Sequence, residues 1–244
     1  MKKPNFNNNK NQFWLFGNHA VCEALNNDNR IKHQLLVTKN TELNIKLPKT
    51  LRKEIVMKEK LDSLLGRDTI HQGIALLVSP LDSLDIEYAY DKKTVLILDQ
   101  VTDPHNVGAI LRSAVAFDID AVILTDDNSA KESGVLAKSA CGALERMPII
   151  RVVNLKRAIE QLKSNDFWCI GFDGDGKREL KDFNFGNKTA IIMGAEGPGM
   201  RRLTKEACDE ILRISMSPNM ESLNVSNATA IALYESYTAR ISNK

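Results

Sequence analysis

Cysteine and histidine are both scarce in this chain of 244 residues, with four of each. The cysteines form no CxxC pair and the histidines form no cluster; they stand at Cys22, Cys141, Cys169 and Cys208, and at His19, His33, His71 and His105. Metal centres usually draw such residues together at short spacings, so the sequence predicts no metal site. Four unpaired thiols are typical of a reduced, cytoplasmic setting.

Long hydrophobic runs are also lacking. No segment approaches the roughly 18 apolar residues of a membrane span, so we expect no membrane partner. The first residues, MKKPNFNNNKNQ, have neither the apolar centre of a secretory signal nor the arginines of a transit peptide. We predict a disordered tail over residues 1–12. The chain as a whole, with 43% hydrophobic and 26% charged residues, has the composition of a soluble globular protein.

The net charge of +2 is unevenly distributed along the chain. Residues 1–67 hold 13 Lys and Arg against 6 Asp and Glu, whereas the other 177 residues hold 20 against 25. A basic N-terminal part favours a polyanionic partner. A solvated, lysine-rich surface accounts for the same counts, so charge alone leaves both interpretations open.

Helix and strand signals alternate in the N-terminal third. Residues 17–25 and 58–65 have helical patterns, 34–38 and 73–78 have strand patterns, and 55–57 is a short apolar piece. We predict a small α/β domain over residues 13–79. The next stretch, PLDSLDIEYAYDKK, begins with proline, carries four acids and has no clear period. Residues 80–93 are therefore predicted to be a linker.

From residue 94 the alternation is clearer, and it predicts a second α/β domain over 94–244. Strand patterns cover 94–99, 121–125, 149–153, 167–173, 189–193 and 211–215, and helical patterns surround Ile110 and cover 132–140, 155–162, 200–207 and 223–241. We predict a mainly parallel sheet with helices on both faces. Ligands of such sheets bind beyond the carboxyl ends of the strands. The loops 99–106, 194–199 and 215–224 are thus expected to lie near one another.

The first of these loops leads into DPHNVGAILRSA, residues 103–114. Asp103 can cap a helix whose first turn contains Pro104. An apolar stripe at helical spacing follows, formed by Val107, Ile110, Leu111, Ala114 and Val115. Asn106 and Arg112 stand at the margins of this stripe, where a core-facing helix needs neither of them. For Arg112 a salt bridge at the helix margin is the simpler interpretation.

The second loop, MGAEGPGM at 193–200, is rich in glycine, which permits close backbone approach. Its glycines follow the order G-x-x-G-x-G, and no acidic residue closes the next strand, so an NAD-binding fingerprint is improbable. A Walker loop is excluded because no GK[ST] sequence follows. A plain glycine turn, with Glu196 favouring the helix N-terminus, remains an alternative.

The third loop and the helix after it read NMESLNVSNATAIALYE, residues 219–235. Polar side chains are crowded here, at Ser222, Asn224, Ser226, Asn227 and Thr229. Ser222 or Asn224 can cap the last helix, but one cap needs only one of them. The other polar groups must find different partners.

These three stretches, taken in order, resemble the three motifs of the SpoU/TrmH family of RNA ribose 2′-O-methyltransferases, within the SPOUT superfamily. The resemblance covers about residues 13–241 and includes the flanking stretches LFGNHAVCEAL, HQGIAL and AKSACGALERMPIIRV. It is closest to the RlmB-type branch, which methylates a guanosine ribose in 23S ribosomal RNA. The resemblance implies a trefoil knot in the C-terminal domain, an obligate homodimer with a shared active site, and an N-terminal RNA-binding domain.

The family resemblance also assigns roles to individual residues. It implies S-adenosylmethionine as cofactor, held by Met193, Gly194, Gly197, Ile214, Met216 and Leu223. The implied catalytic residues are Asn106, Arg112, Glu196, Ser222 and Asn224. An arginine keeps its proton at physiological pH, so we expect Arg112 to stabilise developing negative charge rather than act as a base. Asn106 and Arg112 are then expected to face a ligand pocket at the edge of the core.

Two features of the resemblance leave the substrate open. His71 and Gln72 are implied to contact RNA, but a structural role in a turn fits them equally. For Ile214, plain strand core is the alternative to cofactor binding. The helix after the third motif reads SNATAIALYE, where the family pattern has SVATAICLFE or a similar sequence, so Asn227 is an unexpected polar residue. The leading hypothesis is methylation of a guanosine in 23S ribosomal RNA. The alternatives are a transfer RNA guanosine as substrate, or a ribosome assembly factor without catalysis.

Overall fold

The computed structural model describes residues 12–43, 45 and 47–242, so most of the predicted disordered tail lies outside the described residues. The chain forms two compact units. The first extends to Asp82 and also includes Glu132–Glu145, and the second comprises Ser83–Lys131 and the chain from Arg146 onward. Segment 132–145, which the sequence pattern places in the second domain, thus packs with the first unit. The chain passes between the units three times.

The first unit is built on a four-stranded sheet with the order β1-β4-β2-β3. Only β2 and β3 are parallel. Its elements are β1 (Phe13–Phe16), α1 (Asn18–Asn26), β2 (Lys32–Val37), β3 (Arg52–Ile55), α2 (Lys58–Leu65), β4 (Ile74–Val78) and α4 (Gly134–Ala140). The predicted helices and two of the strands are confirmed. The sequence analysis did not predict β1 and β3 as strands; β3 is a polar edge strand whose side chains are mostly exposed, so it lacks an apolar pattern.

The second unit contains a seven-stranded sheet with the order β7-β6-β5-β10-β8-β11-β9. Every pair of neighbouring strands in it is parallel, which confirms the predicted mainly parallel sheet. The strands are β5 (Thr94–Asp99), β6 (Ala121–Thr125), β7 (Ile149–Val152), β8 (Trp168–Phe172), β9 (Arg178–Glu179), β10 (Thr189–Gly194) and β11 (Glu210–Arg213). The two-residue strand β9 is too short to give a pattern, and the sequence did not predict it.

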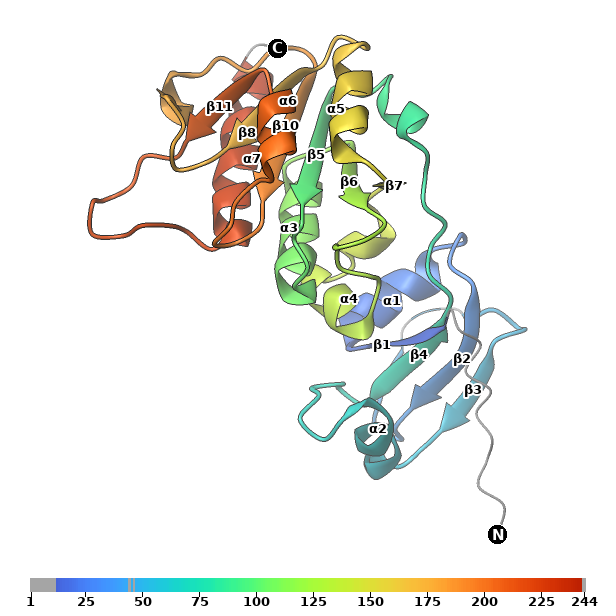
Figure 1. The fold of residues 1–244 in the computed structure, drawn as a ribbon. Coiled ribbons are helices and arrows are strands. Elements are labelled where there is room, and N and C mark those ends of the chain that lie inside the picture. The colour runs from blue at the N-terminus through green and yellow to red at the C-terminus, as the bar shows by residue number, and fades with distance from the viewer. Residues whose placement is uncertain (1–11, 44, 46, 243–244) are drawn as a thin grey trace. The chain divides into compact units, whose positions relative to one another are not determined.

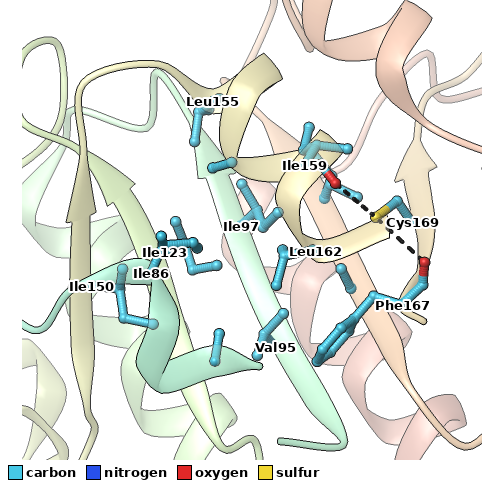
Figure 2. Close-up of a cluster of buried hydrophobic side chains, with 14 of the residues drawn as sticks. Ile86, Val95, Ile97, Ile123, Ile150, Leu155, Ile159, Leu162, Phe167 and Cys169 are labelled. Atoms are coloured by element: carbon cyan, nitrogen blue, oxygen red, sulfur yellow. Dashed lines mark hydrogen bonds between the residues drawn. The ribbon is translucent and has the colours of Figure 1, made fainter. Parts of the chain in front are cut away.

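Helices cover both faces of this sheet, as predicted (Figure 1). They are α3 (Pro104–Ala116), α5 (Leu155–Lys163), α6 (Arg202–Ala207) and α7 (Val225–Ser242). Figure 2 shows Val95 and Ile97 of β5 packed with Leu155, Ile159 and Leu162 of α5. All six residues of β5 are buried. Because side chains alternate along a strand, Leu96, which lies between Val95 and Ile97, faces the other layer, where α3 packs against α7.

Helix α3 begins as its sequence predicts. The Asp103 side chain accepts a hydrogen bond from the backbone N of His105 at 2.9 Å, and Pro104 occupies the first turn. The apolar stripe is buried at Val107, Ile110, Leu111 and Ala114, whereas Val115 is only half-buried. The cap and the stripe together fix where the helix starts and which face it turns to the sheet.

A buried ion network joins segment 132–145 to the rest of the first unit. The Arg30 side chain is fully buried; its Nη2 lies 2.6 Å from Glu145 Oε1 and its Nη1 lies 2.7 Å from Glu132 Oε2. Nη1 also donates to the carbonyl of Ser79 at 2.9 Å. Burial raises the pKa of Glu132 despite the nearby guanidinium. Burial opposes the charge of Arg30 too, but the two carboxylates outweigh it and raise its pKa.

The described residues offer neither a membrane span nor a metal-binding cluster. None of their helices has both the length and the apolar character that crossing a bilayer requires. The same residues contain no group of three or more His, Cys, Asp or Glu side chains able to hold a metal ion.

Candidate active site

The carboxyl ends of three strands in the second unit bring the three sequence motifs together. β10 lies between β5 and β8, with Gly194 in register with Asp99. β11 lies on the far side of β8. The segments after β5, β10 and β11 therefore start at the same edge of the sheet. Hydrogen bonds between their side chains confirm that the three predicted loops meet.

Asn224 links one side chain from each motif. Its Nδ2 donates to Asn106 Oδ1 at 3.1 Å and to Glu196 Oε2 at 3.0 Å. Its Oδ1 accepts from the backbone N of Ser226 at 2.9 Å, as an N-terminal cap of α7 does. The predicted cap is therefore Asn224, and its amide nitrogen holds the other two motifs in place. All the hydrogen-bonding groups of this amide are used.

The glycine loop folds back tightly on itself. Ala195 and Gly199 exchange backbone hydrogen bonds of 3.2 and 3.0 Å. A Cβ atom on Gly194 would lie 2.2 Å from the backbone of both Gly199 and Met200, so no side chain fits there. Gly197 and Gly199 have φ values of +85° and +70°, which favour glycine. The glycines are thus required by the course of the loop.

A pocket of about 460 Å³ lies against this loop. Glu196 and Ser222 line this pocket. So do all six residues assigned to cofactor binding, which are Met193, Gly194, Gly197, Ile214, Met216 and Leu223. The lining combines apolar side chains with four carboxylates, at Asp173, Asp175, Glu196 and Glu221. The pocket has the size of a small-molecule site and offers both an apolar slot and groups that attract positive charge.

Gly194 and Gly174 both line this pocket and offer a matched test of it. We expect Gly194→Ala to weaken cofactor binding more than about tenfold, because the added methyl group pushes the loop out of its course. Gly174→Ala adds the same methyl group where no atom lies within 4 Å. Titration calorimetry measures the affinity of both variants for S-adenosylmethionine. Equal affinities of the two variants would contradict the importance of the close approach between Gly194 and the backbone of Gly199 and Met200.

The remaining assigned residues lie at different places. Asn106 is connected to the site through Asn224, but neither asparagine lines the pocket. Arg112 follows Asn106 by six residues on α3, is exposed, and is also absent from the lining. Neither Asn106 nor Arg112 lines this pocket, so the expectation that they face a ligand pocket at the edge of the core stays a prediction. Both lie on the helix that begins beside it.

His71 and Gln72 belong to the first unit and have structural partners. His71 is only 3% exposed. Its Nδ1 accepts from the backbone N of Gly73 at 3.0 Å, so its Nε2 carries the hydrogen that faces Asp62 Oδ1 at 2.9 Å. Gln72 is exposed with φ +57°, and its side-chain oxygen accepts from the backbone N of Asn18 at the start of α1. This supports the turn interpretation, and contact with RNA stays a prediction.

Sequence reasoning missed an ion pair at the end of β5. Asp99 is fully buried, and its carboxylate accepts from the backbone N of Arg201 at 2.9 Å and from Arg201 Nε at 2.7 Å. Arg201 immediately follows the glycine loop, so Asp99 holds the end of that loop. The signal was present in the strand TVLILD, whose one acid follows five residues with buried side chains. A buried carboxylate requires a partner.

Two thiols near the sheet, the buried Cys169 and the half-buried Cys208, are poor nucleophiles. Burial raises the pKa of Cys169 and of Cys208 to about 12 in each case, and the charge of Asp209 adds to the effect. Both thiols therefore stay protonated at neutral pH. Neither thiol lines the pocket, whose polar side chains are carboxylates, the Lys205 ammonium group and the Ser222 hydroxyl group.

Comparison with known proteins agrees with these observations. Residues 93–234 match the model of the SpoU rRNA Methylase family, and residues 14–84 match the model described as RNA 2′-O ribose methyltransferase substrate binding. The 23S rRNA (guanosine-2′-O-)-methyltransferase RlmB of Vibrio cholerae is 36% identical over 242 residues, which cover 94% of this chain and 98% of that protein. The RlmB protein of Escherichia coli K12 is 45% identical over 177 residues, which cover 70% and 73%.

The fold has a solved counterpart in the SpoU methyltransferase AviRb from Streptomyces viridochromogenes, crystallised with AdoMet. That structure superposes with a TM-score of 0.81 at 21% identity, covering 99% of this chain and 95% of that one. The family model spans more than half of the chain, and its match includes all three motifs that meet at the pocket. The chain belongs to the SpoU rRNA methylase family.

Proposed function

We propose that this protein transfers a methyl group from S-adenosylmethionine to the ribose 2′-OH of a guanosine in 23S ribosomal RNA. The observation that carries the proposal is the Asn106–Asn224–Glu196 cluster, which joins the three family motifs beside a pocket of small-molecule size. The curated relatives at 36–45% identity are named for this reaction. The combination of site and relatives defines both the reaction type and the substrate class.

The pocket fits S-adenosylmethionine in shape and in charge. Met193, Ile214 and Leu223 provide an apolar slot of the kind that adenine occupies, and the folded-back glycine loop presents backbone groups beside it. The lining contains four carboxylates and one lysine, Lys205, whose Nζ lies 3.0 Å from Asp173 Oδ2. A net negative pocket favours a ligand with a sulfonium and an ammonium group. When bound, this cofactor supplies an electrophilic methyl group.

The protein's own residues must position and activate the weakly acidic 2′-OH. The Arg112 guanidinium can donate two hydrogen bonds to the developing alkoxide and the neighbouring phosphate, which stabilises negative charge on oxygen. Asn106 and Glu196 are fixed to each other through Asn224, so they hold the loops around the acceptor in one geometry. Ser222 lines the pocket and contributes a hydroxyl group to it. The proton of the 2′-OH passes to phosphate or water, because Arg112 is already protonated at physiological pH and cannot accept it.

The first unit bears on the choice of RNA. The family model that matches residues 14–84 is described as substrate binding, and this unit contains the basic part of the chain. Both features favour ribosomal RNA over transfer RNA, because the shorter transfer RNA enzymes of the family usually lack such a domain. The relatives' named substrate also supports a cytoplasmic location.

Methyl transfer with two RNAs tests the proposal. Purified protein is incubated with tritiated S-adenosylmethionine and either unmodified 23S ribosomal RNA or bulk transfer RNA. We expect alkali-resistant label at a guanosine of the 23S RNA. Label on transfer RNA alone would change the substrate and retain the chemistry. Absence of label from both RNAs and from assembling ribosomal subunits, with cofactor binding intact, would contradict methyl transfer.

We further propose the trefoil knot and the homodimer that the family resemblance implies. Three apolar side chains of α7 support a dimer, since Ile231, Tyr234 and Ile241 are 39%, 52% and 50% exposed. We expect light scattering to give twice the mass of one chain. Replacing Ile231 and Tyr234 together by serine is expected to shift the mass toward one chain, and a monomeric wild-type protein would contradict the proposal.

A further inference from the structure

The ion pair between Asp99 and Arg201 does more than hold the glycine loop. Asp99 is fully buried, yet 42% of the Arg201 side chain is exposed. Both the backbone N and the side-chain Nε of Arg201 are bonded to this one carboxylate. The near edge of the guanidinium is therefore fixed, and its far edge, with Nη1 and Nη2, extends beyond the pair.

The far edge of this guanidinium is not used by the described part of the chain. Among the residues that the structure describes, Nη1 and Nη2 of Arg201 make no hydrogen bond and no ion pair. The adjacent Arg202 differs in this respect, because its Nη1 lies 2.6 Å from Glu206 Oε1 in an exposed pair on α6. Arg201 directly follows Met200, which lines the pocket. Arg201 is therefore held in one orientation next to the site, and its Nη1 and Nη2 remain available to donate hydrogen bonds to a ligand.

We propose that Arg201 binds a backbone phosphate of the substrate RNA, with Asp99 as the residue that positions it. The two terminal nitrogens of a guanidinium match two phosphate oxygens, which gives a bidentate, charge-assisted contact. Fixing the Nε edge beforehand reduces the conformational entropy that RNA binding must overcome. The lining carboxylates repel phosphate, so a fixed cation beside them also restricts where the RNA backbone lies. This inference rests on the proposed function for the identity of the ligand.

Arg201→Gln tests the far edge of the guanidinium selectively. The glutamine Nε2 occupies the place of the arginine Nε, so the bond to Asp99 is retained while both terminal nitrogens and the charge are removed. The buried carboxylate then lacks a cation, which is expected to lower the stability of this variant. The double variant Asp99→Asn with Arg201→Gln makes the pair neutral. Arg202→Gln is the matched control, because it removes the same charge one residue further along.

Binding of an unmodified 23S RNA transcript is measured at a series of KCl concentrations. For both Arg201 variants we expect about tenfold weaker binding at low salt. The slope of log affinity against log salt should be smaller by about 0.7 to 1, as for one lost phosphate contact. Affinity for S-adenosylmethionine should stay within about twofold of wild type. Arg202→Gln should leave the salt slope unchanged.

Three results would overturn the inference. The first is an unchanged salt slope in the folded double variant. The second is an equal change in Arg202→Gln, which would indicate a general surface charge. The third is a loss of S-adenosylmethionine affinity instead of RNA affinity, which would place Arg201 at the cofactor. Failure of the proposed function is separate from these results, because it appears as a wild-type protein that binds RNA and transfers no methyl group.

Discussion

Replacing Arg112 by alanine is expected to lower the rate of methyl transfer by about 10²- to 10³-fold, the usual effect of removing a donor that stabilises developing negative charge. Cofactor affinity should change little, because Arg112 is exposed on α3 and does not line the cofactor pocket. Single-turnover transfer of tritium to 23S ribosomal RNA separates the chemical step from binding. Arg202→Ala serves as the control for loss of one exposed arginine.

Two further measurements separate charge stabilisation from proton removal. Arg112→Lys keeps the charge and loses the two-pronged geometry, so we expect it to recover only part of the rate. The pH–rate profile of the wild-type enzyme should show no ionisation near neutrality that Arg112→Ala abolishes, because an arginine stays protonated there. Finding such an ionisation would indicate a general base and would contradict the proposed role of Arg112.

The second large effect concerns stability of the first unit. Replacing Arg30 by methionine is expected to lower its free energy of unfolding by about 3–5 kcal/mol, because Glu132 and Glu145 lose their cation while buried. Urea unfolding followed by the fluorescence of Trp14 reports on this unit once Trp168, in the second unit, is replaced by phenylalanine. Glu54→Gln, which breaks the exposed pair with Lys60, should cost at most about 1 kcal/mol.

The loss of stability in Arg30→Met is expected to depend on pH in a defined direction. Burial raises the pKa of Glu132 in the folded protein above its ordinary value of 4.5. Such a group contributes its stability below the unfolded pKa and loses it as pH rises through the folded pKa. The deficit of Arg30→Met should therefore be smaller near pH 4.5 and larger at neutral pH. A deficit that grows on acidification would contradict the network as described.

The sequence predicted most of the fold because its main elements follow simple periodic patterns. The buried strand β5 and the capped, amphipathic helix α3 are examples, since both signals are local. The polar edge strand β3 and the two-residue strand β9 were missed because neither has an apolar pattern. The loops of the site were expected to meet because a parallel sheet places its carboxyl ends together.

Particular contacts in the site were beyond sequence reasoning. Asn224 was one of several polar residues in its loop, and only the structure shows its amide between Asn106 and Glu196. The strand TVLILD indicates that Asp99 is buried and needs a partner, but that partner, Arg201, lies about one hundred positions away, so no local pattern identifies it. The sequence left His71 open between contact with RNA and a structural role in a turn, and the structure shows it buried with both ring nitrogens bonded. Long-range polar pairing, unlike periodicity, leaves no trace in neighbouring residues.

The three passages of the chain between the units determine how this protein can be taken apart. A single cut between residues 83 and 93 severs residues 1–82 from the rest of the chain, but segment 132–145 of the first unit stays covalently joined at both ends to the second unit. A fragment ending at Asp82 would lack both carboxylates that neutralise the buried Arg30. The first unit is therefore not a removable module, and exchange of this unit between relatives has to carry segment 132–145 along with the N-terminal residues.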